Sequence, residues 1–580
     1  MVNITSIKDL RQKKYYRFYE GFLAITFILF FLLIVFLSIF QTFIAANIIF
    51  GISFLWLLRV NLICLHTIYG YKLMQKWQKV DWLKLITDMS KGFNYNKCVT
   101  NIKNISTTKE WSARIDRDIN VIKNNQGTQF ENPYNIYQFP IFAVYTESSS
   151  VLKRSLNAIF QSKYPLNKIT VFITQEERAG EAHNALIRSE IQKCNWINSY
   201  NLSEKDNQFV FNDDHVNLAF ESSSFASYKG CENKLNVIFV QHPEGLLGEI
   251  KGKASNESYA GRQISLFCKH NNISPEMAIT TSLDADSAIG ENFFQMLVYR
   301  FVATEDRKQC GFQPIPVYSN NYFTTNFWPR LISANTTLWQ FAQSSIEEEA
   351  KFFANYCVPV NVLQEINFWQ TDVIAEDALC FTKSYCHYKG QFRVVPFFGV
   401  FKGDAVEADS YTETLENQYK QLQRWAWGGI ECFPFIMQRL FHDSDTKDIP
   451  LISRLGFAWN EYSNHAFWSV IPTLFSIGVF IPYIFGSVEF KNSVFFYNYT
   501  VFSSLFAWIS LIVVSIFSYL TLVFISSQKG QNITVGMVVK IIYQSFFASF
   551  VYGAMGIPAI DSQLRGLRGK YLGYWVTPKK

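Results

Sequence analysis

The chain has 580 residues, of which 49% are apolar and only 17% charged, a composition that points to globular sequence mixed with membrane segments. The net charge of +6 is spread thinly, without a basic run or an aromatic platform motif, which argues against nucleic-acid binding. The ten cysteines show no CxxC spacing, so reduced thiols are expected rather than a disulfide framework or a zinc site.

Two apolar stretches near the N-terminus have the length of membrane spans. Residues 22–43 are almost wholly apolar, and residues 45–69 are apolar apart from Arg59 and Asn61. Each stretch reaches the roughly 20 residues that a bilayer core requires. A signal peptide is the alternative for the first stretch, but its apolar run is too long and no small-residue cleavage site follows. The flanks on both sides are basic, so we predict a hairpin with both ends in the cytoplasm.

Further apolar stretches follow near the C-terminus, at 468–486 and 501–525 and, more weakly, at 535–557. A long polar region separates them from the hairpin and is predicted to be cytoplasmic. Three full spans would place the tail outside, whereas the excess of basic residues in the tail favours the cytoplasm. We therefore expect one stretch, 535–557 with Lys540 and Gln544 inside it, to be re-entrant or interfacial.

The polar region has the pattern of an α/β domain. Short β-rich runs recur between helical patterns, and their continuous apolar character indicates a parallel sheet buried on both faces. Ligands of such sheets bind beyond the carboxyl ends of the strands. The polar residues at the predicted strand ends are Thr146, Glu147, Glu176, Glu177, Asp284 and Asp286.

Asp284-Ala-Asp286 is expected to hold a divalent cation. Carboxylates are ligands for Mg²⁺ or Mn²⁺, and such a cation can neutralise a departing phosphate group. Two further Asp-x-Asp copies, at 116–118 and 443–445, lie in polar context and are interpreted as solvated loops. The alternative role for the copy at 284–286 is helix capping.

A second acidic pair, Glu376-Asp377, lies between the sequences TDVI and ALCF. A carboxylate there can act as the general base for an attacking hydroxyl group. The alternative is an exposed helix N-terminus, where acidic residues suit the helix dipole.

Gln421, Arg424 and Trp425 fall at positions i, i+3 and i+4 of a predicted helix, and therefore on one face. That face offers an amide, a guanidinium fork for phosphate oxygens and an indole that can stack on a sugar ring. The alternative is an amphipathic helix at the membrane interface.

Five motifs, taken in order, resemble those of glycosyltransferase family 2. They are strand–Thr-Glu, Gly-Lys-Ala-x-Asn, Asp-Ala-Asp, Glu-Asp and Gln-x-x-Arg-Trp. The membrane-integrated branch with cellulose, chitin and hyaluronan synthases is the most similar. The resemblance covers residues 137–430 and the flanking membrane helices. It implies an α/β domain of the GT-A fold, a UDP-sugar donor, a Mg²⁺ or Mn²⁺ ion and inversion at the anomeric carbon.

The resemblance also implies roles for the motif residues. Asp377 would be the general base, Glu376 would help to place it, and Trp425 would form the acceptor platform. The donor set is Thr146, Glu147, Glu176, Lys253, Asn256 and Asp284, the acceptor and diphosphate set is Gln421, Arg424 and Trp425, and the metal ligands are Asp286 and Asp284.

The sequence departs from the family pattern in two places. The second strand of the family usually ends in Asp-Asp or Asp-Gly, whereas this one ends in Glu176-Glu177, and either glutamate could replace the aspartate. The segment 242–249 is unlike cellulose synthases and resembles a less characterised bacterial subgroup, so the identity of the sugar does not transfer.

The C-terminal residues Val576, Thr577 and Lys579 belong to a segment similar to the Phe-x-Val-Thr-x-Lys gating loop of cellulose synthases. A loop that closes over the nucleotide excludes water. The alternative is a short basic terminus.

These observations predict an integral plasma (inner) membrane protein with a cytoplasmic catalytic domain. The predicted segments are a cytoplasmic N-terminus (1–21), a transmembrane hairpin (22–69), a lead-in (70–136), the GT-A domain (137–430), interface helices (431–466), C-terminal transmembrane or re-entrant helices (467–558) and a cytoplasmic tail (559–580).

The predicted reaction transfers a sugar from a UDP-sugar to a growing polysaccharide, processively and coupled to membrane translocation. The alternative is transfer of one sugar to a membrane lipid, which would give a glycolipid. A degenerate membrane scaffold is disfavoured by the intact acids Asp286 and Asp377. The expected partners are the lipid bilayer, the donor and the acceptor, together with a second copy or accessory secretion subunits.

Overall fold

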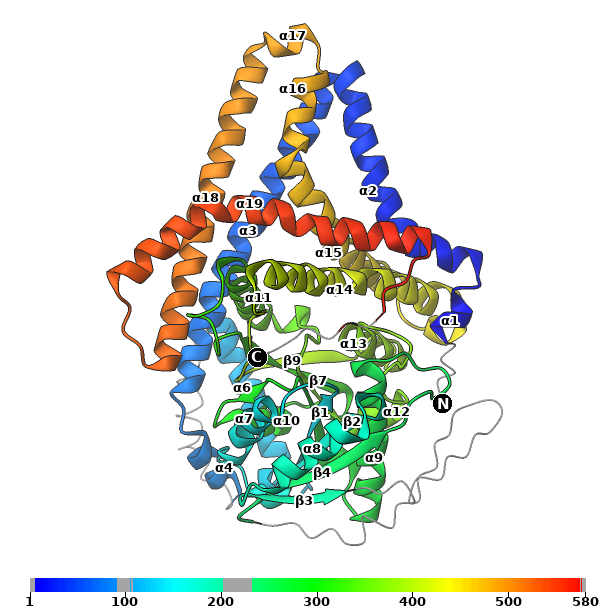
Figure 1. Ribbon diagram of the computed structural model, residues 1–580, viewed down its shortest axis with the longest axis vertical. Helices are drawn as coiled ribbons and strands as arrows, with labels where there is room; N and C mark the ends of the chain where they lie inside the picture. The colour runs from blue at the N-terminus through cyan, green and yellow to red at the C-terminus, as the bar shows by residue number, and fades with distance from the viewer. Residues whose placement is uncertain (1–5, 91–104, 106–107, 202–231, 574, 576–580) are drawn as a thin grey trace.

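The structure is a computed structural model that describes residues 6–90, 105, 108–201, 232–573 and 575. Figure 1 shows an α/β part built around one sheet and long apolar helices that project from one side of it. Two helices, α14 (Tyr411–Met437) and α19 (Val535–Arg568), run across the molecule between these parts.

The sheet has nine strands in the order β3-β4-β2-β1-β5-β8-β7-β9-β6. Its first five strands are parallel, and β8 then pairs antiparallel with β5. The parallel pairing that the sequence predicts is therefore confirmed for these five strands, but the sheet as a whole is mixed and GT-A-like, because β8 and β6 pair antiparallel with their neighbours. The strands are β1 (Tyr137–Val144), β2 (Thr170–Glu176), β3 (Ile197–Asn201), β4 (Leu235–His242), β5 (Ala278–Leu283), β6 (Ala288–Ile289), β7 (Cys310–Val317), β8 (Tyr356–Pro359) and β9 (Arg393–Lys402).

Helices cover both faces of the sheet, which explains the continuous apolar character of its strands. In β1, Phe139 and Ile141 pack on the face covered by α9, α12 and α13, whereas Phe142 and Val144 pack on the face of α7, α8 and α10. The helices of this part are α4 (Trp82–Ser90), α6 (Lys109–Asn124), α7 (Ser149–Phe160), α8 (Glu181–Gln192), α9 (Lys253–His270), α10 (Phe293–Val302), α11 (Phe327–Ser345), α12 (Val360–Glu365) and α13 (Glu376–His387).

Three helices in the described residues are long and apolar enough to cross a membrane: α2, α3 and α18. A fourth span is possible by length if α15 and the helical residues up to Phe485 count as one span, bent by 48°. The helices of this part are α1 (Ile7–Leu10), α2 (Lys14–Phe40), α3 (Thr42–Gln78), α15 (Leu451–Ser476), α16 (Ile481–Phe485), α17 (Val488–Lys491) and α18 (Val494–Lys529).

Helix α19 follows a different course from these spans. The helix runs across the others as one continuous element (Figure 1), and its first turns, Val535–Gln544, are apolar. Its later turns pack on α14 and α15. The carbonyl of the last described residue, Trp575, then accepts a hydrogen bond from Arg424 of α14 at 3.2 Å.

The interpretation of 116–118 as a solvated loop is wrong, whereas 443–445 is a largely exposed turn, as the sequence predicts. Residues 116–118 lie on α6, where Asp118 is buried and accepts a hydrogen bond from Arg300 at 2.7 Å. Residues 443–445 carry carboxylates that pair with Arg439. Of these two copies, the one at 116–118 therefore joins elements distant in sequence through Asp118, whereas the one at 443–445 makes local ion pairs.

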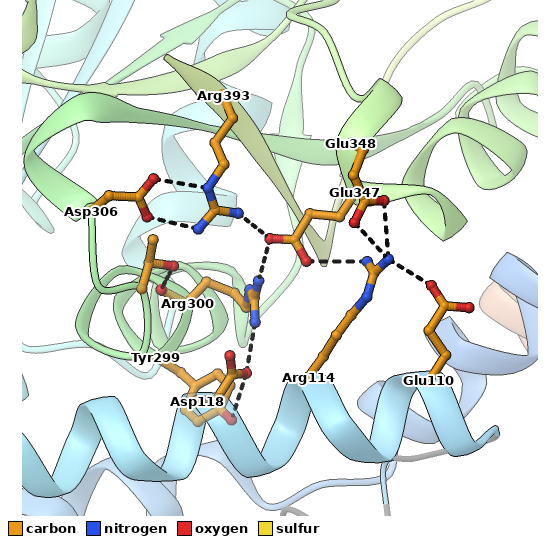
Figure 2. A network of polar contacts seen from close by, with 10 residues as sticks. Glu110, Arg114, Asp118, Tyr299, Arg300, Asp306, Glu347, Glu348 and Arg393 are labelled. Atoms are coloured by element: carbon orange, nitrogen blue, oxygen red, sulfur yellow. Dashed lines mark hydrogen bonds and ion pairs between the residues drawn. The ribbon is translucent and has the colours of Figure 1, made fainter. Parts of the chain in front are cut away.

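Figure 2 shows the larger network to which Asp118 belongs. Its centre is Glu347, whose carboxylate accepts hydrogen bonds from the guanidinium groups of Arg114 on α6, Arg300 on α10 and Arg393 on β9. The three cations hold the pKa of Glu347 below its usual range although burial alone would raise it. The network joins three elements at the start of the segment that leads into β8.

Candidate active site

Acidic side chains gather where the parallel strands β1, β2 and β5 end. Glu147 follows β1, Glu176 ends β2, and Asp284 and Asp286 follow β5. Because these strands are neighbours and parallel, their carboxyl ends share one edge of the sheet, and all four residues line one cavity.

The cavity has a volume of about 2240 Å³ and is continuous from the sheet edge to the apolar helices. Its sheet end contains Tyr145 and the acids just named. Its middle is lined by residues of α13 and α14, and its far end by residues of α3, α15 and α18. We call these regions the donor end, the middle and the membrane end.

The Asp284–Asp286 turn is held from two directions. The backbone N–H of Asp284 donates to Asn355 Oδ1 at 3.0 Å, and Asn355 Nδ2 donates to Ser287 at 2.5 Å. Asp286 Oδ2 accepts from the backbone N–H of Asp404 at 2.9 Å. Asp286 is 1% exposed, whereas the side chain of Asp284 is 37% exposed.

The donor end fits a cation whose shell is completed by substrate. Among the described residues, no group of three His, Cys, Asp or Glu side chains is arranged to hold a metal ion. Mg²⁺ commonly uses one or two carboxylates together with phosphate oxygens and water, which matches the pair Asp284 and Asp286. Asp404 Oδ1, in the cavity wall beside this pair, is buried and has no hydrogen-bond partner in the described part of the chain.

Asp404 escaped the sequence analysis, although the signal for it was present. Like the predicted acids, it follows an apolar run, here β9, with Gly403 between. Its other oxygen accepts a hydrogen bond from Arg154 at 2.8 Å.

Lys253 balances several of the acids. It lies at the start of α9, and its ammonium group is 3.1 Å from Asp284, 3.2 Å from Glu376 and 3.7 Å from Glu257. It also donates to the carbonyl of Ala354 at 2.8 Å. Burial raises the pKa of Glu257 and of Glu376, and Lys253 opposes that shift in both.

Glu376 and Asp377 begin α13 but do not form an exposed helix end. Glu376 is buried, and both residues line the middle of the cavity. Asp377 accepts hydrogen bonds from the backbone N–H groups of Ala354, at 3.1 Å, and Ala378, at 2.8 Å. Burial raises the pKa of Asp377, and these amides oppose the shift because they stabilise the charged form.

The segment Phe353–Asn355 connects Asp377 to the Asp284–Asp286 turn. Gln313 on β7 accepts from the N–H of Phe353 at 2.9 Å and donates to the carbonyl of Asn355 at 3.1 Å. Ala354 between them has a φ of 53°, a left-handed conformation that a non-glycine residue adopts only when its surroundings enforce it. The sequence analysis missed this segment because its role depends on contacts distant in sequence.

Helix α14 presents Gln421, Arg424 and Trp425 to the cavity, so the predicted shared face exists. The ring of Trp425 meets that of Phe353 edge to face, with centroids 6.4 Å apart. Arg424 donates to the carbonyl of Trp575 at 3.2 Å, which ties the start of the C-terminal tail to this helix.

The two glutamates at the end of β2 differ in position. Glu176 is buried in the cavity wall and pairs with Arg178, whose guanidinium lies 3.8 Å from the ring centre of Tyr145. Glu177 instead accepts from the backbone N–H of Glu244 at 2.8 Å. Glu176 is therefore the glutamate that faces the donor end.

Several predicted residues lie elsewhere. Asn256 is fully buried and donates to the carbonyl of Thr174 at 3.1 Å, so it holds α9 on β2 below the cavity. Thr146 is exposed and is outside the cavity lining. Val576, Thr577 and Lys579 fall outside the described residues.

Part of the chain matches a known protein family. Residues 279–527 match the family described as glycosyl transferase family group 2. The mannosyltransferase PcManGT from Pyrobaculum calidifontis, solved with GDP-Man and Mn²⁺, shares 14% identity over 70% of this chain and 95% of its own, with a TM-score of 0.38. Residues 1–349 of S. aureus TarS share 11% identity over 69% and 93%, with a TM-score of 0.27, and 0.26 when bound to UDP-GlcNAc.

No curated protein matches the chain. The likenesses to solved structures are distant, so they indicate neither the sugar nor the acceptor. The family match covers most of β5, the Asp284–Asp286 turn, the Glu376–Asp377 pair and the cavity face of α14. The resemblance that the motifs indicate is thereby confirmed for residues 279–527, which match a glycosyl transferase family 2 group.

Proposed function

We propose that the protein transfers a sugar from a UDP-sugar to a saccharide acceptor, with Mg²⁺ or Mn²⁺ and with inversion at the anomeric carbon. The observation that supports this most strongly is that the Asp284–Asp286 turn and Asp377 line the same cavity. A donor held at the turn and an acceptor held beside Asp377 can therefore meet.

The donor end offers groups for each part of a nucleotide-sugar. Tyr145, with Arg178 over its ring, provides a flat surface for the base, and Glu147 and Glu176 can accept hydrogen bonds from base or ribose. Asp284 and Asp286 would hold the cation, which when bound supplies positive charge to the departing diphosphate.

Asp377 is proposed as the general base. It takes the proton of the acceptor hydroxyl while that oxygen bonds to the anomeric carbon, and the bond from this carbon to the diphosphate breaks on the opposite face. UDP leaves with the electron pair. The amides of Ala354 and Ala378 stabilise the ionised carboxylate against the effect of burial, and Glu376 is paired with Lys253.

The extent of the cavity favours a long acceptor. Beyond Asp377 it passes the rings of Trp425 and Phe353 and continues between α3 and α15. Aromatic faces can hold successive sugar rings without residue-specific bonds. We therefore propose processive synthesis, with the product entering the membrane part, the sheet domain in the cytoplasm, and a second copy or an accessory subunit completing the passage.

The test is incubation of the protein in nanodiscs with a panel of UDP-sugars and Mg²⁺ or Mn²⁺, followed by product sizing. We expect one UDP-sugar to give a ladder of lengthening products. Only singly glycosylated lipid would favour the alternative acceptor, and no consumption of any UDP-sugar would contradict the donor class.

A further inference from the structure

Glu431 is a buried carboxylate of α14 that the proposed mechanism does not use. It is 3% exposed and lies about 9 Å further along the axis of the helix than Trp425. Its Oε2 accepts hydrogen bonds from the backbone N–H groups of Ile374, at 2.8 Å, and Ala375, at 2.9 Å. Two main-chain donors on one buried oxygen indicate that this carboxylate holds the segment to which they belong.

That segment leads directly into Glu376 and Asp377. Ala375 is the N-cap residue of α13, and its carbonyl accepts from the N–H of Leu379 at 3.2 Å, which begins the hydrogen bonding of the helix. The place of Ala375 therefore sets the place of the first helical turn, which carries Asp377.

Side-chain packing supports the same contact between α14 and this segment. Ile374 packs with Trp427 and Ile430 of α14 in a small apolar cluster. The indole N–H of Trp427 donates to the other oxygen of Glu431, at 3.0 Å. The carboxylate of Glu431 is thus fixed by its own helix while it holds the segment before Asp377.

The start of the segment is held by other parts of the chain. Asp372 accepts hydrogen bonds from the hydroxyl of Ser6, at 2.9 Å, and from the backbone N–H of Ile7, at 2.6 Å. The carbonyl of Thr371 accepts from the N–H of Ile250 at 2.9 Å. These contacts fix the start, whereas Glu431 fixes the end that adjoins Asp377.

The contacts of Glu431 call for an acceptor of the right reach. Burial raises the pKa of Glu431, and the N–H of Ala375 and the guanidinium of Arg11 oppose that shift. The N–H groups of Ile374 and Ala375 can bond equally to the oxygen of a neutral amide. Reach and charge can therefore be separated by substitution.

We propose that Glu431 is a positioning residue, which keeps Asp377 at a fixed place relative to the acceptor face of α14. Trp425 and Glu431 belong to one helix, so a movement of that face during chain growth carries the base with it. A misplacement of about 1 Å can cost about a hundredfold in rate. This inference rests on the proposed function, because it takes Asp377 as the base and Trp425 as the acceptor platform.

The experiment compares two substitutions of Glu431. Glu431→Gln keeps an oxygen at the same reach and removes the charge, whereas Glu431→Asp keeps the charge and is one methylene shorter. Glu431→Gln should stay within about threefold of the wild-type kcat, and Glu431→Asp should lower kcat roughly ten- to a hundredfold. Calorimetry with UDP and Mn²⁺ should give the wild-type affinity for both variants, because the donor end is unchanged.

Hydrogen exchange gives a readout that does not depend on turnover. In nanodiscs, the peptide that contains residues 372–379 should exchange faster in Glu431→Asp than in the wild type, and at the wild-type rate in Glu431→Gln. If Glu431→Asp does not fold, Glu431→Leu takes its place, because it removes the acceptor without leaving a buried charge.

Two control variants remove other hydrogen bonds of α14. Trp427→Phe removes the indole donor and leaves both bonds from Glu431 to the segment. Ser562→Ala removes a buried hydrogen bond of 2.9 Å to the carbonyl of Gln423 on the same helix. Both should keep the kcat and the exchange rate of the wild type, which would show that the loss of any buried bond to α14 is not enough.

The contrary outcomes are distinct. A kcat of Glu431→Gln as low as that of Glu431→Asp, or lower, overturns the inference, and so does a parallel loss of UDP affinity, which indicates a general structural role. Unchanged exchange in Glu431→Asp refutes this inference alone. If the wild type consumes no UDP-sugar, the proposed function is refuted, and the exchange rates still decide whether Glu431 holds the segment.

Discussion

The backbone N–H of Ala354 lies 3.1 Å from the carboxylate of Asp377, so the base is oriented by main chain in addition to its own helix. The carbonyl of the same residue accepts from Lys253, which also contacts Asp284. One short segment therefore links the proposed base to the proposed cation site. A displacement of this segment would disturb both halves of the reaction.

Replacing the base should separate catalysis from donor binding. Asp377→Asn should lower kcat by roughly 10²- to 10⁴-fold, because an amide cannot accept the hydroxyl proton. The affinity for UDP should change little. Steady-state UDP release and calorimetric UDP binding measure the two effects, and loss of UDP binding with an unchanged rate at saturation would make Asp377 a binding residue.

Removing a charge from the cation site should abolish transfer. Asp286→Asn should be inactive but folded and membrane-inserted, and EDTA should silence the wild type. The matched control is Asp116→Asn, because Asp116 belongs to another Asp-x-Asp copy and is exposed on α6. Full activity of Asp286→Asn, or of the wild type in excess EDTA, would refute the metal-dependent mechanism.

The pH dependence of kcat should show whether the segment around Ala354, which Gln313 fixes by hydrogen bonds, tunes the pKa of Asp377. Asp377 must be ionised to act, so the rate should fall as the pH drops through its pKa, which burial raises. Gln313→Ala loosens the segment and weakens the stabilising amide, so the acidic limb of kcat should move up by about half a pH unit. Gln129→Ala, on an exposed glutamine, should not shift it. An unshifted limb in Gln313→Ala would show that the segment does not tune the base.

The indole of Trp425 should matter for chain growth. Trp425→Ala should suppress polymer formation but spare UDP-sugar hydrolysis, which needs only donor, cation and water. Trp508→Ala, on the exposed side of α18 and away from the cavity, should leave polymer length unchanged. Product sizing by gel distinguishes these cases. If Trp425→Ala made polymer of wild-type length, Trp425 would not be the acceptor platform.

The ion-pair network of Figure 2 should contribute to stability rather than chemistry. Glu347→Gln removes the negative charge that pairs with three guanidinium groups. It should therefore lower the free energy of unfolding by about 3 kcal/mol. Glu348→Gln, whose side chain is 72% exposed, should cost about 0.5 kcal/mol or less. Thermal unfolding in detergent compares the two, and equal losses would contradict the central place of Glu347.

The sequence predicts those parts of the site that depend on local pattern. Acids after apolar runs mark the strand ends, and helical spacing places Gln421, Arg424 and Trp425 on one face. It does not predict that Asn355 holds the Asp284 turn, because that contact joins residues far apart in the chain. The same reason explains the error over Asp118, whose partner Arg300 lies on another helix.

The most direct test of the central claim is a cryo-EM map of Asp377→Asn in nanodiscs with a UDP-sugar and Mn²⁺. The account predicts density for Mn²⁺ between the diphosphate and Asp284 and Asp286, the base beside Tyr145, and the sugar facing residue 377. Nucleotide density away from these acids, or a cation bound elsewhere, would contradict it.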